Sequence, residues 1–355
     1  MAVQTPSFIG QNLGSGAFSA TYATQTELFM KVFAGEVLQT FETATAMKPL
    51  HMIRTINNGK SAQFPVTGIA SAKYHTPGQD IMIEGAYNTV FKHTEKVINL
   101  DDLLLASCFI DKLDEARNHY DVRSVYTQEL GRALARQFDK NTLGLAVLSA
   151  ATFAAAVPTA RGANITGQTG TGILVSNAAF NGAHTSGTIT NSSAVVTAFI
   201  NSLYEMARQM DDRNVPAEDR YCVITPGTYY NLINSAEGRV LINRDFGAAP
   251  GTSYAAAQLA EVAGFQLVKS NIAPGVYGTD LSAALAGANN TYGANFSRVI
   301  CACFQKQAFA TLKLMDLSLE SDYDIRLQGN LMVAKYAMGH GTLRPECSGI
   351  ITATA

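Results

Sequence analysis

A long run of helically spaced apolar residues constrains the fold of this chain more than any other feature. Between about residues 114 and 150, apolar side chains recur every four residues at Tyr126, Leu130, Leu134 and Phe138. This spacing predicts one continuous amphipathic helix. At the rise of an α-helix, such a segment extends roughly 45 Å. We therefore expect this helix to act as a structural axis for the rest of the fold.

The chain carries unusually little charge for its size. Charged residues make up 15% of its 355 residues, against about 25% in a typical soluble domain. Its 26 basic and 28 acidic residues nearly cancel, so contacts with nucleic acid are expected to be local and weak. Because 47% of the residues are apolar, the chain can bury a substantial core. The low share of charged residues indicates that copies of the chain cover part of its surface.

The N-terminal segment and the cysteines bear on cellular location. Residues 1 to about 26 are rich in Gly, Ser, Thr and Ala, which predicts an arm without a core of its own. No signal peptide or membrane span is expected, because no basic segment precedes an apolar run and no apolar run is long enough. Five scattered cysteines favour reduced thiols over a disulfide framework. They are Cys108, Cys222, Cys301, Cys303 and Cys347.

Other segments outline the remaining architecture. Between His51 and Leu104, turn signals such as Asn-Gly and Pro-Gly separate short alternating runs, which predicts a long two-stranded excursion that needs a surface to lie on. The charge-poor run after Ala150 is interpreted as an insertion loop. A second helix is expected over 193–214, and residues 215–234 predict a strand, a Pro-Gly turn and a helix that open a separate α/β lobe.

Several short motifs resemble catalytic or metal-binding signatures without completing them. The stretch NNGKS at 57–61 lacks the upstream glycine of a phosphate-binding loop, and a turn in the ribbon is favoured. His93 and Glu95 match half of a zinc-deaminase signature whose Pro-Cys-x-x-Cys partner is missing. Cys301 and Cys303 lie in an apolar strand-like run without a second ligand pair at zinc-finger spacing, so they are interpreted as small core residues. We expect no enzyme activity, metal or cofactor.

The stretch AKYAMGHGTLRPE at 334–346 places a histidine between two glycines. Gly339 and Gly341 permit positive φ, so His340 is interpreted as marking a tight structural corner. Arg344 and Glu346 are expected to form a salt bridge within or between subunits, with ordinary surface charges as the alternative.

Six blocks, in order along most of the chain, resemble the major capsid proteins of short-tailed T-seven-like phages. The regions 150–195 and 245–297 resemble them poorly. The blocks are KVFAGEVL (31–38), HMIRTINNGKSAQFPVTG (51–68), KHTEKVINLDDLL (92–104), NHYDVRSVYTQELG (118–131), VPAEDRYCVITPGTY (215–229) and AKYAMGHGTLRPE (334–346).

This resemblance implies an α+β chain with the Hong Kong 97 capsid fold, in which four parts are arranged around the predicted helix. The implied parts are an N-terminal arm (1–53), an extended E-loop (54–97), a peripheral P-domain (98–215 and 311–355) with a spine helix at about 114–150 and a β-sheet, and an axial A-domain (216–310).

The resemblance also implies a function and a set of partners. The chain is expected to assemble with itself, as hexamers and pentamers, into an icosahedral head that encloses packaged double-stranded DNA, which it contacts non-specifically. Scaffolding protein and a portal are the other implied partners, with no membrane. The expected location is the virion, and the host cytoplasm during assembly. We expect a shell held without covalent cross-links.

Two other functions remain open. A cellular nanocompartment shell of the encapsulin type shares the fold but would hold a cargo enzyme. A soluble nucleotide-dependent enzyme is supported only by the incomplete Gly-Lys-Ser motif. For the capsid reading, ten charged residues are candidate contacts between subunits: Arg54, Lys60, Lys73, Asp80, Glu84, Lys92, Glu95, Lys96, Arg344 and Glu346.

Overall fold

The computed structural model describes residues 46–67, 74–82, 93–113, 122–151, 172–235, 261–282, 285 and 289–354. The chain divides into two compact units. The smaller unit contains Leu103–Gln137 and Met315–Ala337, together with Met1–Ala44, which lies outside the described residues. The larger unit contains Thr45–Asp102, Phe138–Leu314 and Met338–Ala355. Among the described residues, the helices are too short or too polar to cross a membrane.

A six-stranded mixed sheet forms the centre of the larger unit. Its central strand β11 is antiparallel to both neighbours, β14 and β8. All its residues are buried, which accounts for the unbroken apolar sequence VICACF. In order across the sheet, the strands are β5 (Ile173–Asn177), β14 (Ser348–Ala353), β11 (Val299–Gln305), β8 (Arg220–Ile224), β10 (Phe265–Lys269) and β9 (Glu261–Val262).

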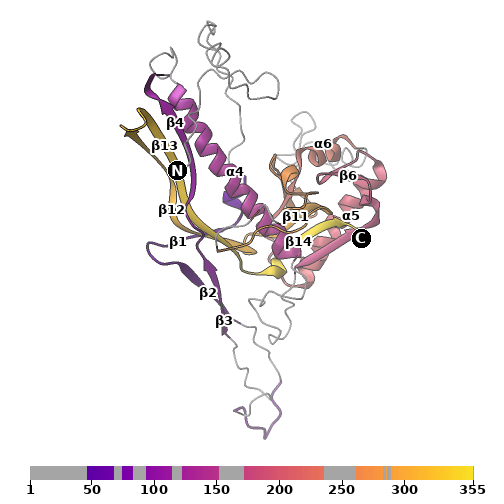
Figure 1. Cartoon of the computed structure of the whole chain (residues 1–355). Coiled ribbons are helices and arrows are strands. Elements are labelled where there is room, and N and C mark those ends of the chain that lie inside the picture. The colour runs from indigo at the N-terminus through magenta and orange to yellow at the C-terminus, as the bar shows by residue number, and fades with distance from the viewer. Residues whose placement is uncertain are drawn as a thin grey trace, which may run out of the picture. The chain divides into compact units, whose positions relative to one another are not determined.

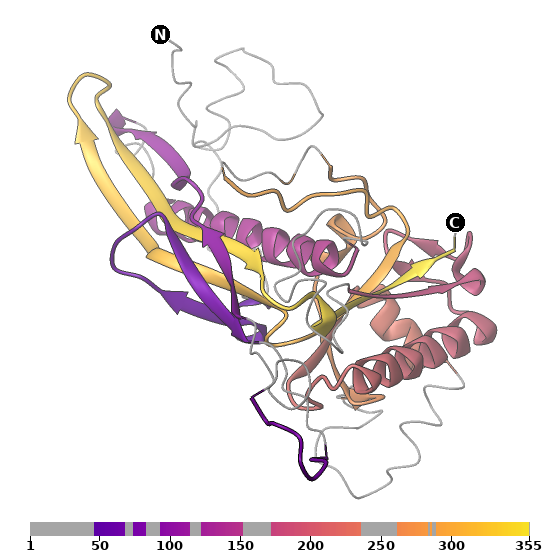
Figure 2. The same cartoon turned by 90° about the horizontal axis from the view of Figure 1, so that it is seen from below.

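Helix α5 (Ser193–Asp212) covers β5 and β14, as Figure 2 shows. It buries Val196, Phe199, Leu203 and Met206, spaced three or four residues apart, so one stripe of the helix faces the core. The predicted second helix is therefore confirmed.

Helix α6 (Pro226–Asn234) follows β8 directly. The hydroxyl of Thr225 accepts a hydrogen bond from the Thr228 N–H, and Pro226 occupies the first turn of the helix. The sequence predicted a separate Pro-Gly turn at this point, and that detail is wrong. A proline needs no hydrogen-bond acceptor in the first helical turn, so the Pro-Gly pair begins the helix instead.

The insertion loop predicted after Ala150 is wrong for the part of that segment that the structure describes. Residues 152–171 lie outside the described residues, but from Ile173 onward the segment supplies core. Ile173, Phe180 and Ile189 are buried, and β5 pairs in parallel with β14. From Ile173 onward, the apolar residues of this segment therefore serve the core. Short elements complete this region: η2 (Ala178–Phe180), β6 (His184–Thr185) and β7 (Thr188–Ile189).

The sheet also combines segments that the sequence assigned to different domains. Strands β5 and β14 come from the predicted P-domain segments, whereas β8, β10 and β11 come from the predicted A-domain at 216–310. The sheet therefore contains strands from both predicted domains, and the boundaries at residues 216 and 310 stay predictions.

A four-stranded sheet has the order β1 (Met52–Thr55), β12 (Phe309–Asp324), β13 (Gly329–Thr342) and β4 (Leu104–Asp111), as labelled in Figure 1. In the larger unit, β1 runs parallel to residues 310–313 of β12. In the smaller unit, β4 runs antiparallel to residues 329–336 of β13.

The predicted long helix is present as α4 (Val122–Ala151). Residues 114–121, where the sequence placed its start, lie outside the described residues. In the smaller unit, Tyr126 and Leu130 of α4 pack against the buried pair Ile110 and Met332.

The predicted two-stranded ribbon is present as β2 (Ser61–Thr67) and β3 (His93–Asn99), which are antiparallel from Ser61↔Asn99 to Thr67↔His93 (Figure 1). Gly59, in the turn before β2, has φ +115°, which explains a glycine in NNGKS. Three further short helices are η1 (Lys48–Leu50), η3 (Ala273–Gly275) and η4 (Pro345–Cys347).

Candidate contact surfaces between subunits

The ribbon has one anchored face and one exposed face. Ala62 and Ile98 are directly opposite each other and join a small core with Leu100 and Leu312. On the other face, Val97 is 41% exposed. Because side chains alternate along each strand, the anchored face fixes which residues the ribbon presents outward.

Three predicted contact residues lie near the base of the ribbon. Arg54 donates from Nη1 to the Gln63 carbonyl (2.9 Å), and its guanidinium lies 5.2 Å from the Phe64 ring centroid. Glu95 is exposed and accepts a hydrogen bond from the Gln63 amide (3.2 Å). Lys96 is half-buried, and burial lowers the pKa of its amine. These local contacts orient the side chains in a single subunit.

Two further candidates are exposed away from that base. The side chain of Lys60 is exposed, and within the described residues it makes no hydrogen bond or ion pair. Asp80 accepts a hydrogen bond from the Met82 N–H (2.9 Å). In the same segment, 74–82, Tyr74 is fully exposed and Ile81 and Met82 are more than half exposed, so this segment exposes apolar side chains as well as charges. Lys73, Glu84 and Lys92 lie outside the described residues.

The last two candidates do not pair with each other. Arg344 donates from Nη1 to Gln307 Oε1 (2.9 Å). Glu346 is only 5% exposed. Burial lowers the pKa of Arg213, and the nearby charge of Glu346 opposes this shift. The two residues therefore do not form the predicted salt bridge within one subunit, and a salt bridge between subunits stays a prediction.

His340 does not mark a corner. It lies within β13, is 3% exposed, and its flanking glycines do not have positive φ. The glycines instead allow the Asn99 backbone and the Ile98 side chain to approach β13 closely. A Cβ at Gly339 would lie 2.1 Å from the Asn99 carbonyl oxygen, and one at Gly341 would lie 2.6 Å from the Ile98 side chain. The corner prediction is wrong because glycine serves two purposes, and here the purpose is packing.

His340 belongs to a buried network of hydrogen bonds, in which the donor of each bond can be assigned. The Met47 carbonyl can only accept, so His51 Nδ1 donates to it (2.7 Å). His51 Nε2 then accepts from the Thr311 hydroxyl (2.7 Å), whose oxygen accepts from His340 Nδ1 (2.8 Å). Burial lowers the pKa of His51 to about 4 and that of His340 to about 3. Both imidazoles are neutral at pH 7, and this hydrogen-bond network has a structural role.

Two carboxylates extend this buried cluster. Asp139 of α4 accepts from the N–H groups of Ala46 (2.8 Å) and Met47 (3.3 Å), and burial raises its pKa to about 6. Asp101 accepts from the Tyr292 hydroxyl, which in turn accepts from the His340 N–H (3.2 Å). These bonds join α4, β13 and residues 46–51 within the larger unit.

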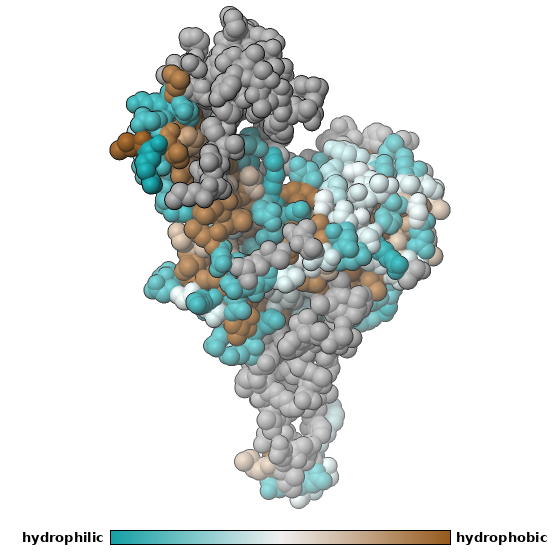
Figure 3. All heavy atoms as spheres, in the orientation of Figure 1, coloured by the Kyte–Doolittle hydropathy of each residue, from teal (hydrophilic) through white to brown (hydrophobic). Residues whose placement is uncertain are grey.

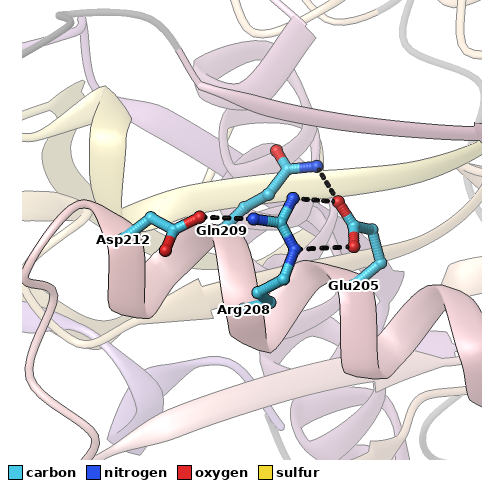
Figure 4. Close-up of polar contacts among 4 residues, drawn as sticks. All are labelled: Glu205, Arg208, Gln209 and Asp212. Atoms are coloured by element: carbon cyan, nitrogen blue, oxygen red, sulfur yellow. Dashed lines mark hydrogen bonds and ion pairs between the residues drawn. The ribbon is translucent and has the colours of Figure 1, made fainter.

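An exposed charged network lies on the outward face of α5 (Figure 4). Arg208 donates to both carboxylate oxygens of Glu205 (2.9 and 2.5 Å) and to Asp212 (2.5 Å), while the Gln209 amide donates to Glu205 (2.8 Å). The hydrogen bond from Arg208 lowers the pKa of Glu205 to about 2. Spacings of three and four residues make such pairs readable from sequence, although our sequence reasoning did not select them.

The smaller unit exposes apolar side chains beside its strands, where Figure 3 shows brown residues over β12 and β13. Our sequence reasoning, which looked for charges, missed this surface. The available signal was β4, in which the outward positions of the alternation include Leu105. The exposed set is Leu103, Leu105, Leu113, Met315, Tyr323, Ile325 and Leu327.

Comparison with known families identifies the chain. The family model described as "Gp10A-like: Major capsid protein" matches residues 63–352. The chain belongs to this family of major capsid proteins. It is 34% identical to the major capsid protein of Enterobacteria phage T3 over 357 residues, which cover 97% of this chain and 95% of that protein. The major capsid protein of Escherichia phage T7 is 33% identical over 358 residues, covering 97% and 96%.

Solved structures agree with the sequence relatives. The capsid structure of the cyanophage P-SCSP1u superposes with a TM-score of 0.73 at 39% sequence identity and covers 99% of both chains. The predicted α+β Hong Kong 97 capsid fold is therefore confirmed. The relatives are phage capsid proteins, which disfavours the nanocompartment alternative.

Proposed function

We propose that this chain is the shell-forming subunit of a phage head, which assembles as hexamers and pentamers into an icosahedral container for double-stranded DNA. The family match over residues 63–352 carries this proposal. The role is structural and needs no catalytic group. The subunit works in the virion and assembles in the host cytoplasm with scaffolding protein and a portal.

The two surfaces described above support the assembly mechanism. The ribbon exposes one face and carries charged residues, and the smaller unit exposes apolar side chains such as Leu105 and Ile325. Single exposed ion pairs contribute little. In a closed shell, however, a subunit leaves only when its contacts with several neighbours break together, so weak contacts add to a stable lattice.

The charged candidates remain proposals for contacts between subunits. Lys60 is the clearest, because its exposed ammonium has no partner among the described residues of its own chain. Arg54 and Glu95 are positioned by Gln63, so they present a fixed arrangement to a neighbour. Glu346 contributes indirectly, because it is buried in its own subunit. The other candidates are Lys73, Asp80, Glu84, Lys92, Lys96 and Arg344.

The test is a charge reversal of the ribbon with a charge-matched control. Replacing Lys60, Lys73 and Lys92 together by glutamate is expected to leave the subunit folded and to lower shell yield at least about tenfold on co-expression with scaffolding protein. The control replaces three lysines outside the ribbon by glutamate and changes the net charge by the same amount as the ribbon variant. These lysines are Lys48, Lys269 and Lys306. Electron microscopy counts the shells. Normal yield from the ribbon variant, or equal loss from both, contradicts a specific role of the ribbon.

The container role has its own test. Particles purified from infected cells are expected to hold nuclease-protected double-stranded DNA and no stoichiometric enzyme. Particles that instead hold one cargo protein at fixed ratio would contradict the DNA-container proposal and leave the shell-forming proposal intact.

A further inference from the structure

Three cysteines converge in the interior of the larger unit. The Sγ atoms of Cys222, Cys301 and Cys303 all lie within 4.8 Å of one another, and the three residues are fully buried. Cys303 of β11 is directly opposite Cys222 of β8, and Cys301 is two residues earlier on β11. All three side chains therefore project from the same face of the sheet.

A fourth sulfur lies on that face. Gly349 of β14 is directly opposite Cys303 on the other side of β11, so the two Cα–Cβ directions point to the same face. A Cβ at Gly349 would lie 2.2 Å from Met206 Sδ of α5. The missing side chain of Gly349 thus leaves room for the buried Met206 thioether beside the cysteines.

The strands depart from regular pairing at the same place. The register between β11 and β14 shifts between Val299 and Cys301. Across β11 and β8, where Ala302 is opposite Val223, the Tyr277 hydroxyl donates to the Val223 carbonyl (3.0 Å) and accepts from the Ala302 N–H (3.2 Å). Such irregularities are enriched next to functional sites, where they redirect side chains.

We propose that Cys222, Cys301 and Cys303, assisted by Met206, form a buried binding site for a monovalent thiophilic metal ion of the Cu⁺ class. A donor set made only of thiol and thioether sulfur is soft and selects such ions over hard cations. Three sulfur ligands suffice for Cu⁺ or Ag⁺, whereas structural zinc almost always takes four ligands.

Charge also favours a monovalent ion. One thiolate and two thiols around one monovalent cation form a neutral group, which a dry core tolerates far better than a net charge. Binding then releases one proton, from one of the three thiols, and requires no change of oxidation state.

The burial of the site decides how it is filled. Since none of the three cysteines is exposed, the ion enters while the sheet forms or during transient opening. Once bound, it links β8 to β11, the central strand of the sheet. Because it binds the folded state, it also raises the resistance of the chain to unfolding.

The test uses Ag⁺, which binds like Cu⁺ but does not change oxidation state under these conditions. Full-length subunit is unfolded, refolded without oxygen with or without Ag⁺, and passed over a desalting column with a competing small thiol. Mass spectrometry of the native protein is expected to show about one Ag⁺ per chain, with a higher thermal midpoint. If the refolded subunit retains no Ag⁺, the proposal is overturned.

Matched variants assign the ion to these residues. Cys303→Ser is expected to lose the ion, whereas Cys347→Ser, another buried cysteine outside the trio, is expected to keep it. Met206→Leu conserves volume and is expected to weaken retention about tenfold. Equal retention by Cys303→Ser and the wild type overturns the assignment.

A second measurement covers the case in which Cys303→Ser does not fold. X-ray absorption of the silver-loaded wild type is expected to show at least three sulfur neighbours. One or two sulfur neighbours, or sulfur replaced by nitrogen and oxygen, contradicts the site. Neither result bears on shell assembly, so this inference and the proposed function fail separately.

Discussion

The two units of this subunit treat their apolar residues differently. In the larger unit, every residue of β11 is buried, and the sheet is covered by helices such as α5. In the smaller unit, residues 104–107 of β4 alternate between half-buried and exposed positions, and Leu105 is 56% exposed. The core around β11 is thus buried within one chain. The smaller unit retains apolar surface of the kind that marks protein interfaces.

The ribbon is intermediate between these two cases. Its inward residues Ala62 and Ile98 are buried within their own subunit, while Val97 on the outward face is exposed. We infer that folding and assembly divide the chain between them. Core substitutions in the larger unit should change the stability of the free subunit, whereas substitutions on the exposed surfaces should change assembly.

The largest effect is expected from a cavity in the six-stranded sheet. Phe304 is fully buried, and its ring lies 5.0 Å from that of Phe309. Phe304→Ala should lower the free energy of unfolding of the unassembled subunit by about 3–5 kcal/mol, measured by urea denaturation. Leu105→Ala is the control, with a change within about 0.5 kcal/mol. Similar losses from both variants would abolish the distinction between the units.

Acid should destabilise the larger unit. The pKa values of His51 and His340 fall from 6.5 to about 4 and about 3 on folding, so the unfolded chain binds more protons and stability falls as pH drops below about 6.5. Asp139, with its pKa raised from 3.8 to about 6, has the opposite effect. Between pH 7 and pH 4, each histidine lowers the free energy of unfolding by about 3 kcal/mol and Asp139 raises it by about 2 kcal/mol, which leaves a net loss of about 4 kcal/mol.

Asp139→Asn sharpens this test. It removes the contribution that opposes the histidines, so the loss of unfolding free energy between pH 7 and pH 4 should grow to about 6 kcal/mol. His75→Gln replaces an exposed histidine and should leave the loss unchanged. A flat pH profile in the wild type, or a smaller loss in Asp139→Asn, would show that the buried cluster does not control acid stability.

A smaller effect is expected at the glycine beside His340. Gly339→Ala places a Cβ against the Asn99 carbonyl and the Leu100 Cα, and backbone cannot move aside as a side chain can. We expect a loss of about 1–3 kcal/mol in the unfolding of the free subunit. Gly275→Ala, where a Cβ meets nothing within 4 Å, should be nearly neutral. Equal effects of the two substitutions would contradict the packing role of Gly339.

Sequence reasoning recovered features that depend on local pattern. The spacing of Tyr126 and Leu130 predicted α4, and the turn signals predicted the β2/β3 ribbon. It failed where tertiary pairing decides. Nothing in the charge-poor segment after Ala150 indicates that β5 joins β14 from the other end of the chain. Similarly, Cys222 approaches Cys301 only because β8 and β11 are neighbours, so the cysteine cluster was invisible to spacing rules.

The smallest effect on the free subunit is expected at the exposed apolar surface of the smaller unit. Leu105 and Ile325 are 56% and 73% exposed, so replacing both with serine removes little buried area and should change the free energy of unfolding by less than about 0.5 kcal/mol. If copies of the chain cover this surface, the same variant should lower shell yield severalfold, because each of many lattice contacts loses apolar area. Thr197→Ala and Asn201→Ala on α5, also exposed, serve as controls. Full shell yield with the double serine variant would show that this apolar surface stays outside the lattice contacts, and the contrast between the units would then reflect folding alone.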